Sequence, residues 1–229
     1  MAAAAASSPP SDVRFVVTGF GKFPGVPANP TEVLVNGLRE DEEAAGKLAS
    51  CEVLKVSART VEDHLRVVHD TVLKDDDAAG GRRRVFVVVH FGVDVCAGGF
   101  KLERRAFNEA DFRLPDEDGF QPRGEPVVPP STSYDKGACL HTRLDVESVA
   151  ERLRGDGFDC EVSHDAGRYV CNYTYFASLS LFQKRDCLYS LFVHVPSFHA
   201  VDAATQAKFA SRLIHRLEEE ASGVASPSS

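Results

Sequence analysis

The sequence predicts an α/β fold in which a mainly parallel sheet lies between two helical layers. Segments typical of strands and of helices alternate along most of the 229 residues, an order that favours parallel strands joined by crossover helices. Two continuous apolar runs, over 85–90 and 189–195, are typical of central strands covered on both faces. A chain of this length can bury a substantial core, and we expect a single domain over residues 13–221.

Each predicted element rests on a periodicity in the sequence. The predicted strands are short apolar or β-branched runs, and the predicted helices repeat apolar residues every three or four positions. In chain order the predicted elements are a strand over 13–18, a helix over 31–44, a strand over 51–58, a helix over 61–73, a strand over 85–90, a helix over 145–153, a strand over 160–163, a helix over 166–181, a strand over 189–195 and a helix over 203–221.

Several ends of these elements are marked by particular residues. Asn29 followed by Pro30 is a typical helix start, and Asp145 is a typical cap. The chain between 103 and 137 is polar and rich in proline, which makes it a long connection for a compact domain. Such a connection is often a cover over a site, although it can equally be a decorated hairpin without a role. We expect the tails, 1–12 and 222–229, to be disordered.

Charge and composition argue against several classes of partner. The formal net charge is −8 and the isoelectric point is near 5.5, so no basic face is expected for nucleic acid or an anionic membrane. No apolar segment reaches the length of a membrane span, and the N-terminus lacks the pattern of a secretory signal. The six cysteines form no CxxC pair, which argues against a zinc site or a disulfide framework. These features predict a cytoplasmic protein.

Cys171 is a candidate nucleophile because of its position. It lies just inside the helix predicted to begin at Ala166, where unpaired backbone N–H groups and the helix dipole favour a thiolate over a thiol. A lone cysteine is more often a small core residue, so the position alone does not establish a catalytic role.

Two other residues raise the case for chemistry at Cys171. His194 is the polar residue at the end of an apolar strand that Pro196 stops, and Glu103 offers a carboxylate to orient it. Cys, His and Glu are the three parts of a cysteine-hydrolase triad. The chief rivals are His90, at the end of another buried strand, and Cys96, in the loop that follows it.

At several separated places the sequence resembles the pyroglutamyl peptidase I family, also called pyrrolidone-carboxylate peptidases. The matching residues span most of the chain in the order found in the family, and together they are specific although each is weak alone. They are Thr18-Gly19-Phe20 with Phe23 and Asn29-Pro30; Leu102-Glu103-Arg104 with Ala106 and Asn108; Asp111 with Arg113, Pro115 and Asp116; Gly119 with Gln121-Pro122; Ala166-Gly167-Arg168-Tyr169-Val170-Cys171-Asn172; and Val193-His194-Val195-Pro196.

The resemblance implies an α/β/α sandwich with a mixed sheet, and a cysteine exopeptidase that removes N-terminal pyroglutamate from peptides without a metal or cofactor. It implies that Glu103, Cys171 and His194 are the catalytic residues. Among the remaining matches, it assigns Phe20 and Phe23 to aromatic residues that hold the lactam ring, where the residues alone favour a role as core plugs. It assigns Tyr169 and Val170 to the pocket beside the nucleophile. These substrate-binding residues are Phe20, Phe23, Tyr169 and Val170.

The chain also departs from the family. In bacterial members of the family this loop resembles the run Ala-Gly-Gly-Arg, whereas this chain has Asp94-Val95-Cys96-Ala97. The arginine of the bacterial loop therefore has no equivalent here. The run Asp165-Ala166-Gly167-Arg168-Tyr169 before the cysteine is similar to the eukaryotic branch. Two alternatives remain open: a non-catalytic binding protein that keeps the pocket, and a cysteine amidohydrolase or deamidase of other specificity. The oligomeric state is left open.

Overall fold

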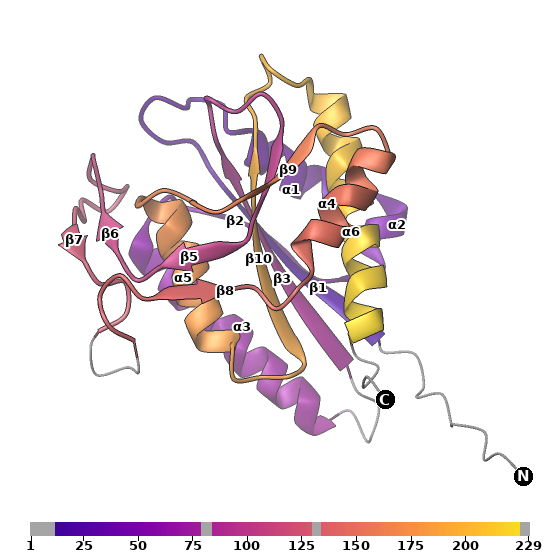
Figure 1. The fold of residues 1–229 in the computed structure, drawn as a ribbon, viewed down its shortest axis with the longest axis horizontal. Coiled ribbons are helices and arrows are strands. Elements are labelled where there is room, and N and C mark those ends of the chain that lie inside the picture. The colour runs from indigo at the N-terminus through magenta and orange to yellow at the C-terminus, as the bar shows by residue number, and fades with distance from the viewer. Residues whose placement is uncertain (1–11, 79–83, 130–133, 225–229) are drawn as a thin grey trace, which may run out of the picture.

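The centre of the fold is a six-stranded mixed sheet. The computed structural model describes residues 12–78, 84–129 and 134–224, and its sheet has the order β2-β1-β3-β10-β4-β9 (Figure 1). The strands are β1 (Asp12–Phe20), β2 (Leu48–Leu54), β3 (Arg84–Val93), β4 (Phe100–Glu103), β9 (Cys160–Ser163) and β10 (Leu188–Val195).

The directions of the strands agree with the prediction of a mixed, mainly parallel sheet. β1 runs parallel to β2 and to β3, and β10 runs parallel to β3. β4 is antiparallel to β10 and parallel to β9, so these two strands run against the other four. The predicted three-layer arrangement is therefore confirmed, and β4, which periodicity did not predict, supplies its change of direction.

Helices cover both faces of the sheet (Figure 1). One face packs against α1 (Pro30–Glu40), α2 (Glu42–Ala45), α4 (Val146–Gly155) and α6 (Ala203–Val224), and the other against α3 (Ala58–Ala78) and α5 (Val170–Phe182). No helix in the described part of the chain is both long enough and apolar enough to cross a bilayer.

Strand alternation decides which side chains face α5. On β10, Tyr189, Leu191 and Val193 join the core under α1, α4 and α6, whereas Phe192 joins the core under α3 and α5. Because successive side chains of a strand point to opposite faces, His194 shares the α5 face with Phe192. The period-two pattern thus brings one polar residue at the carboxyl end of β10 toward the helix that carries Cys171.

The connection between 103 and 137 contains two short ribbons and no helix in its described part. β5 (Arg105–Phe107) pairs with β8 (Cys139–His141), and β6 (Ala110–Asp111) pairs with β7 (Arg123–Glu125). The ribbons lie beside α5, on the side of the molecule away from α6 (Figure 1). Asn172, which follows the nucleophile candidate, accepts from Phe107 N at 2.9 Å and donates to the carbonyls of Phe107 and Glu109.

Several predicted boundaries are wrong for local reasons. The helix predicted over 31–44 is divided at Asp41, whose extended backbone ends α1 and whose side chain caps α2. The strand predicted over 51–58 is β2, shifted toward the N-terminus. Of the predicted tails, Asp12 belongs to β1 and residues 222–224 belong to α6; residues 1–11 and 225–229 lie outside the described part.

Close packing of β1 against α1 requires a glycine. A Cβ added at Gly19 would lie 2.6 Å from the carbonyl oxygen of Thr31 and 2.7 Å from a methyl carbon of Val35, both closer than real Cβ atoms come. In contrast, a Cβ added at Gly37, an exposed position inside α1, would meet nothing within 4 Å. The two glycines belong to the same pair of elements, but a side chain is excluded at Gly19 and has free space at Gly37.

We predict that Gly19→Ala lowers the free energy of unfolding by about 1–3 kcal/mol, because the methyl group forces α1 away from the sheet. Gly37→Ala is the matched control and should raise it by about 0.5–1 kcal/mol, since alanine favours the helix interior. Urea denaturation followed by circular dichroism measures both changes. Equal midpoints for Gly19→Ala and the wild type would contradict this view of the β1–α1 contact.

Candidate active site

Cys171 is the second residue of α5, and the chain before it is not helical. The helix was predicted to begin at Ala166, but it begins at Val170, with Tyr169 in the capping position. Gly167 has φ +81°, and its N–H donates to Asp165 Oδ1 at 3.0 Å, a local turn that delays the helix. The prediction that Cys171 lies at the start of a helix is confirmed. Because α5 begins at Val170 rather than at Ala166, Cys171 lies closer to the N-terminal end of the helix than predicted.

The start of α5 leaves backbone donors available beside the sulfur. Tyr169 makes no side-chain capping hydrogen bond, in contrast to Asn29 at α1 and Asp145 at α4. The first N–H groups of a helix have no partner inside the helix, and they carry its positive dipole end. The N-terminus of α5 can therefore stabilise negative charge on the sulfur or on an oxygen next to it.

His194 and Glu103 meet between β10 and β4. In the antiparallel pairing, Glu103 lies opposite Phe192 and Lys101 lies opposite His194. His194 Nδ1 is 2.7 Å from Glu103 Oε1, and both side chains are buried. Glu103 Oε2 is also buried and has no hydrogen-bond partner within the described chain, so the hydrogen bond of this carboxylate goes to the imidazole.

His194 also interacts with Cys171, and the two partners on either side of the ring hold its proton. Burial by itself lowers the pKa of His194, but the hydrogen bond and charge of Cys171 together with those of Glu103 outweigh it and raise the pKa to about 10. Because Nδ1 faces Glu103, the other ring nitrogen is left for the sulfur. The three residues predicted from sequence form one continuous chain of interactions.

On the neighbouring strand β3, Gly92 leaves space for the Cys171 sulfur and the Phe192 ring. It lies opposite His194 in the parallel pairing of β3 with β10. A Cβ at this position would lie 2.7 Å from the ring of Phe192 and 3.1 Å from Cys171 Sγ. Only glycine allows the sulfur and the aromatic ring to pack against the end of β3.

Neither of the rival residues occupies an equivalent position. His90 is fully buried between Thr18 Oγ1, 2.7 Å from Nδ1, and Ser178 Oγ, 3.1 Å from Nε2. Burial lowers the pKa of His90 to about 3, so its ring is neutral at physiological pH. Cys96 is exposed in the loop after β3, where its backbone N–H donates to Asp94. The interactions of His194 are with Cys171 rather than with Cys96.

Two cavities adjoin Cys171. The smaller one has a volume of about 20 Å³ and is lined by all four residues to which a substrate-binding role was assigned: Phe20, Phe23, Tyr169 and Val170. The larger one, which we call the cleft, has a volume of about 500 Å³ and is lined by both His194 and Glu103. Cys171 lines both, so the sulfur lies at the boundary between a small apolar pocket and a wider opening.

Some residues of the cleft were given no role by the sequence analysis. Arg113, Leu114 and Pro115 form part of its wall, and the Tyr169 hydroxyl donates to the carbonyl of Pro115 at 3.2 Å. Lys101 also lines it and forms a 2.9 Å ion pair with Asp94. The periodicity of a sequence cannot indicate a contact between residues that are 54 positions apart, so only the folded structure shows that these residues line the cleft. Across the described residues, no group of three or more His, Cys, Asp or Glu side chains is arranged to hold a metal ion.

Comparison with known proteins agrees with this geometry. The pyrrolidone-carboxylate peptidase of Clavibacter michiganensis subsp. michiganensis is 31% identical over 185 residues, covering 79% of this chain and 77% of that protein. The pyrrolidone-carboxylate peptidase of Vibrio vulnificus is 28% identical over 211 residues, covering 90% of this chain and 89% of that protein.

Solved structures show the same fold. The pyrrolidone carboxyl peptidase of Thermus thermophilus is 27% identical, with a TM-score of 0.67 and coverage of 90% of this chain and 98% of that chain. The enzyme from Thermococcus litoralis, at 24% identity, has a TM-score of 0.71 over 90% of this chain and 95% of that chain. A model of the pyroglutamyl peptidase family matches residues 13–212. The chain belongs to the pyroglutamyl peptidase family.

Proposed function

We propose that this protein is a cysteine exopeptidase that hydrolyses the peptide bond after an N-terminal pyroglutamyl residue. The observation that carries the proposal is the position of Cys171, which interacts with His194 of the His194–Glu103 pair and lines both a small apolar pocket and the cleft. Membership of the family supports the same activity.

The small pocket suits a pyroglutamyl ring. That ring has no charged α-amine, so an apolar slot can hold it without an ionic partner. Phe20 is buried and forms a fixed wall, whereas Phe23 is half-buried on a short loop. The present volume of about 20 Å³ has room for about one water, so ring entry requires this loop wall to move outward.

The two cavities fix the direction in which a substrate binds. His194 lines the cleft but not the small pocket. The group that gives a proton to the departing amine must lie on the side of the leaving peptide. We therefore assign the small pocket to the pyroglutamyl ring and the cleft to the peptide that follows it.

The proposed mechanism has two steps. The Cys171 thiolate attacks the acyl carbonyl, the C–N bond breaks, and the His194 imidazolium gives its proton to the departing amine. Neutral His194 then takes a proton from water, which attacks the thioester and releases pyroglutamate and the thiolate. Glu103 holds Nδ1–H of His194 and stabilises the imidazolium in both steps.

Oxyanion stabilisation is assigned to the start of α5. The backbone N–H groups of its first turn lie beside Cys171 and receive no side-chain cap. Donors of this kind act on the tetrahedral oxygen at no cost of reorganisation, and each typically contributes about 100-fold or more in rate. This assignment needs no arginine in the 94–97 loop.

We also propose that the chain is of the eukaryotic type. The support is the run Asp165-Ala166-Gly167-Arg168-Tyr169 before the cysteine, together with the loss of the bacterial Ala-Gly-Gly-Arg pattern at 94–97. A cytoplasmic location stays a prediction from the sequence.

The first prediction concerns the nucleophile. Cys171→Ala should lower hydrolysis of a fluorogenic pyroglutamyl amide by at least about 1,000-fold, because Cys171 is the thiol that interacts with His194. Cys96→Ala is the matched control, since Cys96 lines the same cleft, and it should keep most of the activity. If activity is lost with Cys96→Ala and kept with Cys171→Ala, the nucleophile is misassigned. Binding of pyroglutamate without turnover by the wild type would favour the non-catalytic alternative.

The second prediction separates the pocket from the chemistry. Phe23→Ala should lower kcat/KM for the pyroglutamyl amide about tenfold, because the ring loses an apolar wall. The rate at which iodoacetamide alkylates Cys171 should change little, since the substitution leaves the His194–Glu103 pair that acts on the sulfur unchanged. Phe20→Ala should act in the same direction, with a loss of stability added because Phe20 is buried. Parallel losses in turnover and alkylation would argue against a pocket role.

The third prediction concerns pH. His194 must carry a proton to protonate the leaving amine, so activity should fall as pH rises through its raised pKa of about 10. Glu103→Gln removes one of the two negative charges that raise this pKa, so the alkaline limb of kcat/KM should move to lower pH. Glu161→Gln, an exposed carboxylate on β9, is the control and should leave that limb in place. An unshifted limb in Glu103→Gln would contradict the role given to Glu103.

A further inference from the structure

The cleft exposes apolar side chains that a folded chain normally covers. Five large apolar residues are exposed in the described part of the molecule: Val33, Val67, Val95, Leu114 and Phe120. Two of them, Val95 and Leu114, line the cleft, and each is 57% exposed. They come from separate segments, the loop after β3 and the chain before β7, so their meeting at one opening is a product of the fold.

One positively charged side chain of the cleft has no ion-pair partner among the described residues. The other charged side chains of the cleft are paired: Asp94 with Lys101, Glu103 with His194, and Asp165 with Arg168. Arg113 lines the same cleft, is exposed, and forms no ion pair with any described residue. The opening beside the candidate nucleophile therefore combines two bare apolar side chains with an unpaired guanidinium.

Both walls of the cleft are fixed relative to Cys171. The wall that carries Leu114 is held by the hydrogen bond from Tyr169 to Pro115 and by the ring of Phe112, whose centroid is 4.8 Å from that of Tyr169. The opposite loop is held by Asp94, whose side chain accepts from Cys96 N and from Lys101. Because Tyr169 precedes the helix of the nucleophile, the first wall is linked to it through two residues of chain.

We propose that this cleft is a binding site for the leaving part of short peptides, with an apolar residue after pyroglutamate between Val95 and Leu114, and a C-terminal carboxylate at Arg113. The proposal rests on the proposed function, because the direction of binding follows from the position of His194. Burial of an apolar side chain against Val95 and Leu114 favours such peptides, and a guanidinium binds a carboxylate through two parallel hydrogen bonds. The site makes short pyroglutamyl peptides with an apolar second residue the preferred substrates.

The experiment compares kcat/KM for matched substrates on the full-length protein. Pyroglutamyl-leucine and pyroglutamyl-alanine test the apolar contact, and each is compared with its C-terminal amide to test the carboxylate. Pyroglutamyl-leucyl-glycine and its amide show whether the carboxylate is read at the second or the third residue. We expect about a fivefold preference for leucine over alanine, and about a threefold preference for the free acid over the amide at one of the two lengths.

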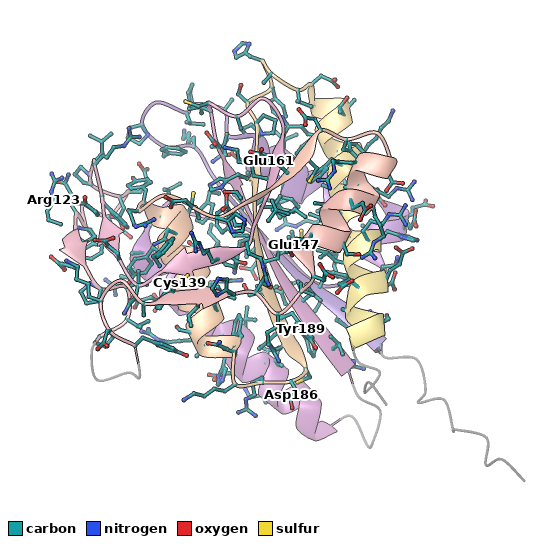
Figure 2. The ribbon with its side chains drawn as sticks, viewed as in Figure 1. Arg123, Cys139, Glu147, Glu161, Asp186 and Tyr189 are labelled. Atoms are coloured by element: carbon teal, nitrogen blue, oxygen red, sulfur yellow. The ribbon has the colours of Figure 1, made fainter. Side chains whose placement is uncertain are left out.

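Variants assign each preference to its side chain. Leu114→Ser and Val95→Ser should each reduce the preference for leucine, and Val67→Ser, which is 63% exposed on α3 outside the cleft, should preserve it. Arg113→Gln should make the acid and the amide equivalent. Arg123→Gln is its control, because Arg123 projects from the outer side of the β6–β7 ribbon (Figure 2). Alkylation of Cys171 by iodoacetamide verifies that each variant is folded around the site.

The outcomes separate this inference from the proposed function. Hydrolysis of all pyroglutamyl substrates at equal rates would overturn the inference and leave the peptidase activity standing. Preferences that persist in the Leu114, Val95 and Arg113 variants would also overturn it, since the cleft would not be their source. If no pyroglutamyl substrate is hydrolysed while Cys171 reacts normally with iodoacetamide, the proposed function fails and the inference fails with it.

Discussion

The buried contact between His194 and Glu103 constrains the rest of the site. A carboxylate at 1% side-chain exposure, with one oxygen unpartnered, is costly unless a positive charge lies against it. His194 supplies that charge because Cys171 on its other side also favours the imidazolium. The charge of Glu103 thus depends on His194, and the charge of His194 depends on both Glu103 and Cys171. The arrangement persists only where the backbone holds all three side chains together. Tyr175 of α5 adds to this by donating to the backbone carbonyl of Glu103 at 2.7 Å.

Two buried histidines on the same sheet face show how neighbouring groups decide the pKa. In the register of β3 with β10, His90 lies opposite Phe192, and Gly92, two residues further along β3, lies opposite His194. His90 is buried between two hydroxyl groups, and burial, with a smaller contribution from the charge of His64, lowers its pKa to about 3. His194, nearer the carboxyl end of its strand, lies between Cys171 and Glu103, which outweigh its burial and raise its pKa to about 10. Residue type and strand pattern are shared, and only the neighbours differ.

Sequence reasoning found the elements that have their own periodicity. The apolar strands, the capped helices, Cys171 and His194 could be predicted because each has a local signature, whereas Glu103 was assigned through the family resemblance. β4 could not, because its four residues become a strand only through pairing with β10 and β9. The start of α5 was misplaced because the turn made by Asp165 and Gly167 interrupts an otherwise helical pattern.

The pocket residues show a second limit of the same kind. Considered as residues alone, Phe20 and Phe23 are predicted to pack in the core under a turn. Only the resemblance to a family assigned them to a pocket. The coordinates add that both line a cavity at Cys171, which no local pattern encodes.

The loop over 94–97 is organised by its first residue. Asp94 accepts from Cys96 N at 3.0 Å and pairs with Lys101, the residue opposite His194 on β4. Although burial opposes ionisation, these hydrogen bonds lower the pKa of Asp94 and keep it charged.

A positive side chain therefore lies at this edge of the cleft, and it is supplied by the strand that carries Glu103. Lys101 is two residues before Glu103, so strand alternation places both on the same face of β4. The loop is joined through Asp94 to the same strand that orients the histidine. Because this ion pair connects the loop to β4, it helps to fix the wall that carries Val95 relative to the His194–Glu103 pair.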